Sequence, residues 1–241
     1  MHLTFEHALF KKLTVPIIFI GLLSACATQN IAQISKLERP DSGLSILLLP
    51  IDVELSELSA GGASTTRADW TIAAKDNLSI AVKDKLREFN VKTAPFNQPA
   101  EESPEFKDIT ELHALHAAVG HAVQLHLFTP GMELPSKKRS LDWTLGPRAN
   151  ILRERYKADY ALFIHVRNTY ADGGRVAYGL ALVLLFGIAI PMGEQVGFAS
   201  LVDLKNGDVV WYNKLHRAGG DMRTLEPTRE SANVLLASMP K

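Results

Sequence analysis

The chain has little cysteine and no excess of positive charge, and each of these absences excludes a class of function. It has a single cysteine, Cys26, in 241 residues. A single cysteine cannot form a disulfide within the chain, and it excludes a zinc site built from cysteines. Lys plus Arg and Asp plus Glu number 26 each, so no overall field favours nucleic acid or an acidic polymer. The best candidate for a basic patch, residues 137–139, is short enough to be a solvated loop, and we expect no nucleic-acid partner.

Several catalytic signatures are also missing from the sequence. No G-x-G-x-x-G or Walker pattern follows the first predicted strand, which argues against a Rossmann or P-loop nucleotide site. The chain contains neither a G-x-S-x-G elbow nor an H-E-x-x-H pair. The sequence therefore predicts no catalytic residue, no metal and no cofactor.

The N-terminus has the pattern of an export signal. Lys11 and Lys12 precede an apolar run over residues 13–23. As a helix this run would be ~16 Å long, too short for a bilayer core of ~30 Å. A basic start followed by an apolar stretch of this length is typical of a signal peptide, which we predict over residues 1–25.

The end of this signal resembles a lipobox, the motif of bacterial lipoproteins. It reads Leu23-Ser24-Ala25-Cys26. The resemblance implies a diacylglycerol on the Cys26 sulfur, cleavage between Ala25 and Cys26, and acylation of the new amino terminus. Such acyl chains would anchor the protein in a membrane, since each buried methylene contributes roughly 0.8 kcal/mol. The alternative is a plain signal peptide with an accidental cysteine.

The residues after Cys26 indicate which membrane would hold the protein and how the folded domain is joined to its anchor. Position 27 is alanine, and lipoproteins of this type that stay at the inner membrane tend to carry aspartate there. The resemblance thus implies the periplasmic face of the outer membrane. Residues 26–43 are mostly polar and end in the turn-forming Pro40-Asp41-Ser42-Gly43. We predict a lipidated tether over this range.

Hydrophobic spacing in residues 44–241 predicts one α/β sandwich domain with a mixed sheet and a C-terminal β-hairpin. Strands are expected over residues 44–51, 91–96 and 158–168, and the hairpin over 195–204 and 208–215. Helices are expected over residues 67–89, 108–128 and 148–156, with weaker helical spacing over 226–239. Residues 52–60 are interpreted as an acidic, partly apolar segment rather than as a strand.

Residues 176–192 form an uncharged segment between two predicted strands. As a helix it would be ~25 Å long, marginal for crossing a bilayer. Three interpretations stay open: a buried core element, an insertion that touches the membrane or forms oligomers, and a true span. We favour the core, although seventeen uncharged residues are long for one buried strand.

Two groups of polar residues are candidates for chemistry. Asp52, Glu54 and Glu57 follow the first strand, where open α/β sheets often place ligands, but their spacing identifies no catalytic partner. Four histidines occupy the second predicted helix. They are His113, His116, His121 and His126. At 100° per residue only the first two share a face, so we predict surface or interface histidines rather than a metal site.

The domain also resembles known envelope proteins. The strand from residue 44, the helix from Trp70, the strand over 158–168 and the hairpin resemble a group of uncharacterised proteobacterial lipoproteins. At fold level they are similar to the curli-secretion pore subunit, the lipoprotein activators of penicillin-binding proteins and a neisserial lipoprotein family. In the hairpin the matching residues of "D-x-x-x-G-x-V-x-W" are Asp203, Gly207, Val209 and Trp211.

The resemblance implies a lipid-anchored, non-enzymatic accessory protein of the bacterial cell envelope, supporting an assembly, secretion or transport complex. Its expected partners are the membrane, through the anchor, and envelope proteins or copies of itself. The alternative is an envelope hydrolase or ligand-binding enzyme that uses the acidic segment after the first strand.

Overall fold

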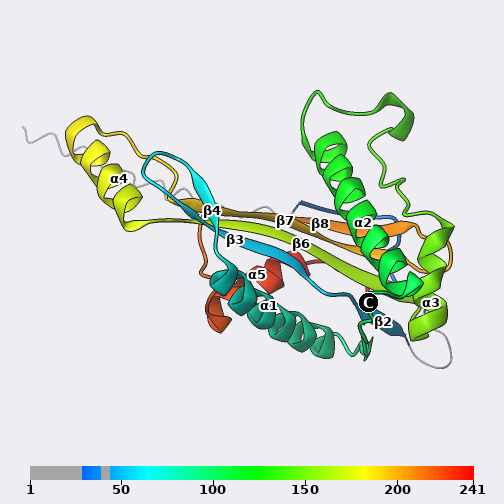
Figure 1. Ribbon diagram of the computed structural model, residues 1–241. Coiled ribbons are helices and arrows are strands. Elements are labelled where there is room, and N and C mark those ends of the chain that lie inside the picture. The colour runs from blue at the N-terminus through cyan, green and yellow to red at the C-terminus, as the bar shows by residue number, and fades with distance from the viewer. Residues whose placement is uncertain (1–28, 39–43) are drawn as a thin grey trace, which may run out of the picture.

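The computed structural model describes residues 29–38 and 44–241. Over these residues the chain is a mixed α/β domain in which helices cover both faces of an open sheet (Figure 1). The predicted fold class is therefore confirmed. Leu23, Ser24, Ala25 and Cys26 lie outside the described residues, and the signal peptide and its cleavage site stay predictions.

The described sheet has eight strands. They are β1 (Gln29–Ala32), β2 (Ser45–Leu48), β3 (Asp52–Leu58), β4 (Ser64–Thr66), β5 (Lys92–Ala94), β6 (Tyr160–Ala171), β7 (Gly193–Asp203) and β8 (Val209–Arg217). Their order is β1-β8-β7-β6-β2-β5, with β3 beside β6 and β4 beside β3. β6 runs parallel to β2 and β3 but antiparallel to β7, so the sheet is mixed as predicted.

The first predicted strand, residues 44–51, is shorter in the structure, and a further strand follows it after a break around Pro50. β2 ends at Leu48 and β3 starts at Asp52, and both pair in parallel with β6. Proline has no N–H to donate, so it interrupts the pairing. The twelve-residue β6 still offers partners beyond the break, which is why residues 52–58 are a strand rather than the acidic segment expected from the sequence.

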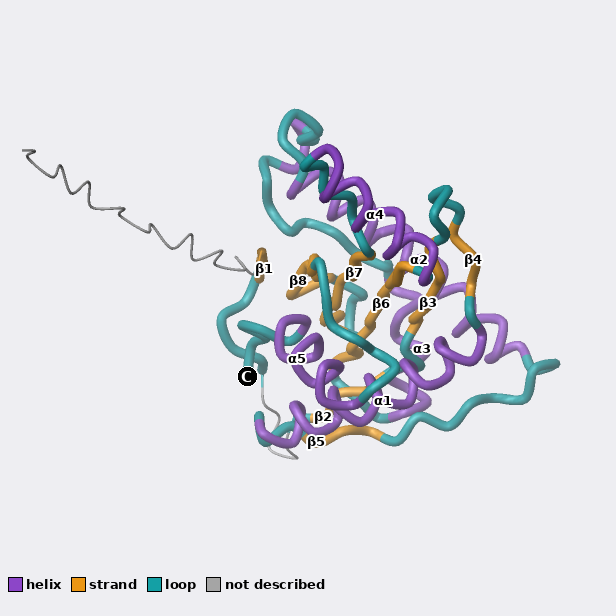
Figure 2. Tube along the Cα trace, turned by 90° about the vertical axis from the view of Figure 1, so that its left-hand side faces the viewer, coloured by secondary structure: helices purple, strands orange, loops and turns teal. Residues whose placement is uncertain are grey.

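Five α-helices complete the described domain. They are α1 (Ala68–Glu88), α2 (Pro104–Phe128), α3 (Asn150–Tyr156), α4 (Gly173–Phe186) and α5 (Leu225–Leu235). α1 and α5 pack on one face of the sheet (Figure 2), where Leu78 and Leu86 join the core. α2 and α3 cover the other face with Leu112 and Leu152. The helices predicted over 67–89, 108–128 and 148–156 correspond to α1, α2 and α3.

The predicted C-terminal hairpin is confirmed as β7 and β8. Its turn contains Gly207, whose backbone has φ +85°. A Cβ at this position would also overlap the carbonyl group of Gly146, because loop 130–147 packs against the turn. Only glycine meets both requirements, so the hairpin turn and the packing of this loop depend on one residue.

Part of the range predicted as a tether, residues 26–43, belongs to the folded domain. β1 pairs antiparallel with β8, with Gln29 opposite Lys214, and Leu37 is buried in the core. The edge of β8 carries unpaired backbone N–H and C=O groups that bond to the extended residues 29–32. The polar composition of these residues does not by itself predict a strand. The folded domain therefore begins three residues after Cys26.

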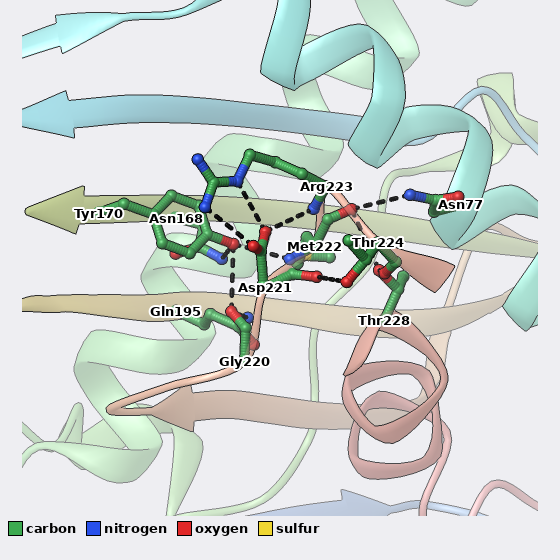
Figure 3. A network of polar contacts seen from close by, with 10 residues as sticks. All are labelled: Asn77, Asn168, Tyr170, Gln195, Gly220, Asp221, Met222, Arg223, Thr224 and Thr228. Carbon is green, nitrogen blue, oxygen red and sulfur yellow. Dashed lines mark hydrogen bonds and ion pairs between the residues drawn. The ribbon is translucent and has the colours of Figure 1, made fainter. Parts of the chain in front are cut away.

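A polar network fixes the loop over residues 218–224, between β8 and α5 (Figure 3). The Tyr170 hydroxyl donates to the Gly220 carbonyl oxygen at 3.1 Å and accepts from the Met222 N–H at 2.7 Å. Gln195 also donates to the Gly220 carbonyl, at 2.6 Å. These contacts tie the far ends of β6 and β7, from which α4 projects, to the rest of the domain.

Candidate functional site

The most unusual surface of the described domain is α4, which lies beyond the end of the sheet in the connection between β6 and β7 (Figure 1). Its start is capped by Asp172, whose carboxylate accepts from the Arg175 N–H at 2.6 Å. Its end is set by Gly187, with φ +68° in the left-handed region that commonly ends helices. α4 is thus a regular, well-capped helix.

The side chains of this helix and of the segment that returns from it face solvent. Leu184, Leu185 and Phe186 are 75%, 73% and 67% exposed. The full set of exposed large apolar residues here is Val176, Tyr178, Leu180, Val183, Leu184, Leu185, Phe186, Ile188 and Met192. Monomeric soluble domains rarely expose a contiguous apolar surface of this kind, and such surfaces mark sites of contact with proteins or membranes.

The preferred interpretation of residues 176–192 as a core element is therefore wrong. Both faces of the sheet are already covered, by α1 and α5 and by α2 and α3, so the segment has no core to enter. Within α4 only Gly179 is buried, against Ile190 and Met192 of its own return segment. Among the described helices, none combines the length and the hydropathy that crossing a membrane requires.

The acidic candidates do not form a catalytic pair, because each already has a polar partner. Asp52 accepts from His165 Nδ1 and from Arg167 Nη1, both at 2.8 Å. Burial raises the pKa of Asp52, but the hydrogen bonds from His165 and Arg167 outweigh it and hold that pKa well below its usual range. Asp52 therefore stays an anion that orients its two neighbours, and it is poorly suited to act as a general acid.

The other two carboxylates belong to the contacts between β3 and its neighbours. Glu54 accepts from the Thr66 hydroxyl at 3.2 Å, and Glu57 pairs with Arg67 at 3.0 Å. Strand alternation places Asp52 and Glu54 on one face of β3 and Glu57 on the other, so the three carboxylates do not converge on one site. Glu54 and Glu57 therefore stabilise contacts between β3 and the residues that follow it at this edge of the sheet.

Of the four histidines of α2, which the sequence predicted at surface or interface positions, one is buried against the sheet. His116 is only 4% exposed and its Nε2 lies 2.6 Å from the Ser200 hydroxyl on β7. Burial lowers the pKa of His116 to about 3, so the ring is neutral. The ring of His121 contacts His165 of β6, with centroids 4.9 Å apart. His126 instead bonds the Met132 carbonyl at 2.7 Å, near the C-terminal end of α2.

This arrangement is a structural contact between α2 and the sheet. Within the described ranges, no group of three or more histidine, cysteine, aspartate or glutamate residues is placed to hold a metal ion. The His116 ring also stacks on Phe163, with centroids 4.3 Å apart. These rings therefore fill space between α2 and the sheet.

A crevice of about 470 Å³ lies at the carboxyl ends of the parallel strands β2 and β5. One wall is apolar and includes Leu49 and Phe96, whereas α1 supplies Lys75, Asp76, Ser79 and Lys83. Open α/β sheets often bind ligands at this kind of edge. The acids after the first strand were the only candidates that the sequence offered near this edge, and none of them lines the crevice. The spacing of α1 gave no reason to place two lysines over the strand ends.

Taken together, the described residues form a mixed α/β domain with an exposed apolar helix at one end. The chain matches no family model and no curated protein. It is similar to two solved structures of PelC dodecamers from Paraburkholderia phytofirmans, one of them a point variant, with 12% and 14% sequence identity and TM-scores of 0.37. Each match covers 89% of this chain and 98% of that chain. At this TM-score the likeness carries no argument about fold, assembly or function.

Proposed function

We propose that the chain is a lipid-anchored, non-enzymatic accessory protein of the bacterial cell envelope, working through surface contacts within an assembly, secretion or transport complex. The lipobox-like sequence ending at Cys26 supports the anchor. The exposed apolar surface of α4 supports the mode of action, and it is the observation that carries the proposal.

The physical reason is the cost of leaving this surface in water. Nine large apolar side chains are exposed between residues 176 and 192. Covering apolar surface is worth roughly 25 cal/mol for each Å² removed from water. A segment that exposes several such side chains together gains this free energy only when something else covers it, which is how a contact surface works.

The arrangement of the acids supports a non-enzymatic role over the hydrolase alternative. Asp52, Glu54 and Glu57 are each engaged with a neighbouring side chain. A general acid or base needs a pKa near the working pH, whereas the pKa of Asp52 is shifted away from it. Replacing the three residues by their amides and assaying hydrolysis in envelope fractions tests this choice, and a loss of turnover would favour the enzyme.

The contact surface is tested by changing α4 without disturbing the core. The double variant Leu184→Ser, Phe186→Ser should keep the melting temperature of the parent chain, because both side chains are exposed. It should fail to restore the phenotype of a strain lacking the protein. Ile72→Ser on α1 is the matched control, since Ile72 is also exposed but lies apart from α4 and should restore it fully.

The anchor needs a separate test. Cys26→Ser should abolish labelling with radioactive palmitate and leave the precursor uncut by the lipoprotein signal peptidase. Persistent labelling of this variant would contradict the lipobox interpretation. A labelled wild type combined with a fully functional α4 variant would instead keep the anchor and reject the contact surface.

A second candidate function, ligand binding, is favoured by the crevice above β2 and β5. Neither Lys75 nor Lys83 forms an ion pair with a described carboxylate, and both lie beside the apolar side chains of Leu49 and Phe96. With Asp76 included, the lining charge is positive by one unit, that is, two lysines less one aspartate. A small organic anion with an apolar part, such as an aromatic phosphate ester, fits this lining.

Phenyl phosphate is a suitable probe for the crevice. Its binding, followed by calorimetry, should weaken in Lys75→Gln, Lys83→Gln and strengthen in Asp76→Asn, because the two changes shift the local charge in opposite directions. Lys214→Gln, on β8 across the sheet, is the control. Equal effects of all the lysine changes would indicate nonspecific charge attraction and reject the site.

A further inference from the structure

We infer that α4 inserts into one leaflet of a lipid bilayer and forms a second membrane contact beside the lipid anchor. The inference rests on the proposed function only for the choice of membrane, since the insertion itself follows from α4. The partner that covers α4 is the acyl-chain region of lipid rather than a second copy of the chain or another protein. Four features of the described residues support this choice.

The first feature is that apolar exposure extends around the helix. Leu184, Leu185 and Phe186 follow one another, so at 100° per residue they already span 200° of the circumference. Leu180 and Val183 cover much of the remainder, on the opposite side. A folded protein partner covers one stripe of a helix, whereas lipid surrounds it on every side, and helices that are apolar all round are found in such surroundings.

The second feature is the match between helix length and leaflet thickness. The fourteen residues of α4 make a helix of ~21 Å. A leaflet contributes half of the hydrocarbon core, ~15 Å, and the whole core measures ~30 Å. α4 is long enough to enter one leaflet from its surface and too short to reach the other side.

The third feature is that two backbone carbonyls in the last turns of α4 are capped by the residues that follow the helix. The Gly187 N–H donates to the Val183 carbonyl at 3.0 Å, and the Ile188 N–H donates to the Leu182 carbonyl at 3.3 Å. The Gly187 bond is that of the αL cap, in which the first residue beyond the helix donates to the carbonyl four residues before it. Unpaired carbonyls are costly in hydrocarbon, so each capped carbonyl lowers the cost of placing the tip of α4 there.

The third feature extends to the base of the segment, where its side-chain polar contacts are confined. Arg175 donates from Nε to the Pro191 carbonyl at 2.8 Å and from Nη1 to the Ser59 carbonyl at 3.3 Å. Residues 176–192 beyond it carry no charge. A cation at the base and apolar side chains toward the tip reproduce the order of headgroups and acyl chains in a leaflet.

The fourth feature is that the chain leading to the anchor enters the sheet from the side that carries α4. Gln29, the first residue of β1, lies opposite Lys214, and β8 continues from there to Arg217. Arg217 pairs with Gln195, two residues from the start of β7 at Gly193, where the α4 segment ends. Cys26 precedes Gln29 by three residues, a reach of at most ~11 Å. An acyl chain on Cys26 and the α4 segment can therefore meet the same bilayer.

The test uses the full acylated protein in vesicles of phosphatidylethanolamine and phosphatidylglycerol. Acylation occupies the sole natural cysteine, so Phe186→Cys introduces a unique thiol for a nitroxide spin label. The label at residue 186 should collide with dissolved oxygen, which concentrates in hydrocarbon, and be shielded from a water-soluble nickel chelate. Ile72→Cys, exposed on α1, should show the reverse preference.

Each other outcome overturns the inference. A label at residue 186 that is shielded from both reagents would show that protein covers the helix, either a second copy or a partner. Free access of the nickel chelate would show that α4 stays in water. Failure of the anchor is detected separately, because thiol labelling of the wild-type protein would reveal an unmodified Cys26, and the collision measurement then proceeds with Cys26→Ser.

Discussion

α1 and α4 are both rich in apolar residues, yet they use them in opposite ways. In α1 the residues Ala74, Leu78, Ala81, Val82 and Leu86 form one buried stripe over β3 and α5, and charged residues face solvent. α4 carries no charge after Arg175 and buries only Gly179. The difference teaches that apolar content alone does not place a helix in the core. A one-sided stripe fits a sheet, whereas an all-round apolar helix needs a medium that surrounds it.

The largest expected effect separates the two helices by stability. Leu78→Ala should lower the free energy of unfolding by about 3 kcal/mol, because Leu78 is fully buried and its removal leaves a cavity. Leu184→Ala should change it by less than about 0.5 kcal/mol, since Leu184 is exposed. Urea unfolding of both variants measures the contrast. Equal losses would mean that α4 is packed against the domain after all.

A second prediction extends the comparison to α2, which meets the sheet through histidine as well as through aliphatic side chains. His116 has a pKa of about 3 in the folded protein against 6.5 when exposed, so the unfolded chain binds more protons below pH 6.5. Stability should therefore fall as the pH drops from 6.5 toward 3, by about 2 kcal/mol at pH 5 relative to pH 7.

The low pKa values of His113 and Asp52 contribute with the same sign, the first below pH 6.5 and the second below pH 4. Unfolding of His116→Gln across the same pH range tests the assignment, because this variant should show a flatter profile. Hydrogen exchange should locate the acid-induced loosening in α2 and spare α1. Uniform loosening of both helices would reject the assignment to the histidines.

The last prediction compares two glycines, one at the end of the exposed helix α4 and one inside α2. Gly187→Ala should cost about 1 kcal/mol, because Gly187 is in the left-handed region but a Cβ there meets only open space. Gly120→Ala in α2 should cost more, since its Cβ would overlap the ring of Phe198. Thermal melting of the two variants compares them, and a larger loss at position 187 would show that the tip of α4 packs against something.

The sequence was sufficient where local pattern and tertiary position agree. The stripe of α1 and the turn of the β7–β8 hairpin follow directly from residue spacing and from Asn206-Gly207. The sequence predicted the wrong structure where a segment is placed by partners that are distant in the chain. β1 is polar and short, and only the free edge of β8 makes it a strand.

The candidate site shows the same division. His116 falls in line with Ile109, Leu112 and Val123, the buried stripe of α2, but a histidine in an apolar stripe does not itself predict burial. The signal for α4 was present as the absence of any polar stripe in residues 176–192. What the sequence could not reveal is that both faces of the sheet were already occupied, and this decides between core and surface.

The short pairing of β1 with β8 has a consequence for where the protein can work. Fully extended, the eighteen residue steps from Cys26 to Leu44 would let the domain range ~60 Å from an acyl group. With Gln29 held at the edge of the sheet, three steps separate the cysteine from the fold. Lipidation at Cys26 would therefore hold the folded domain at a short and nearly fixed distance from the bilayer. Anything it contacts has to come down to the bilayer surface, and lengthening the chain between Cys26 and Gln29 would change its working distance without altering the fold.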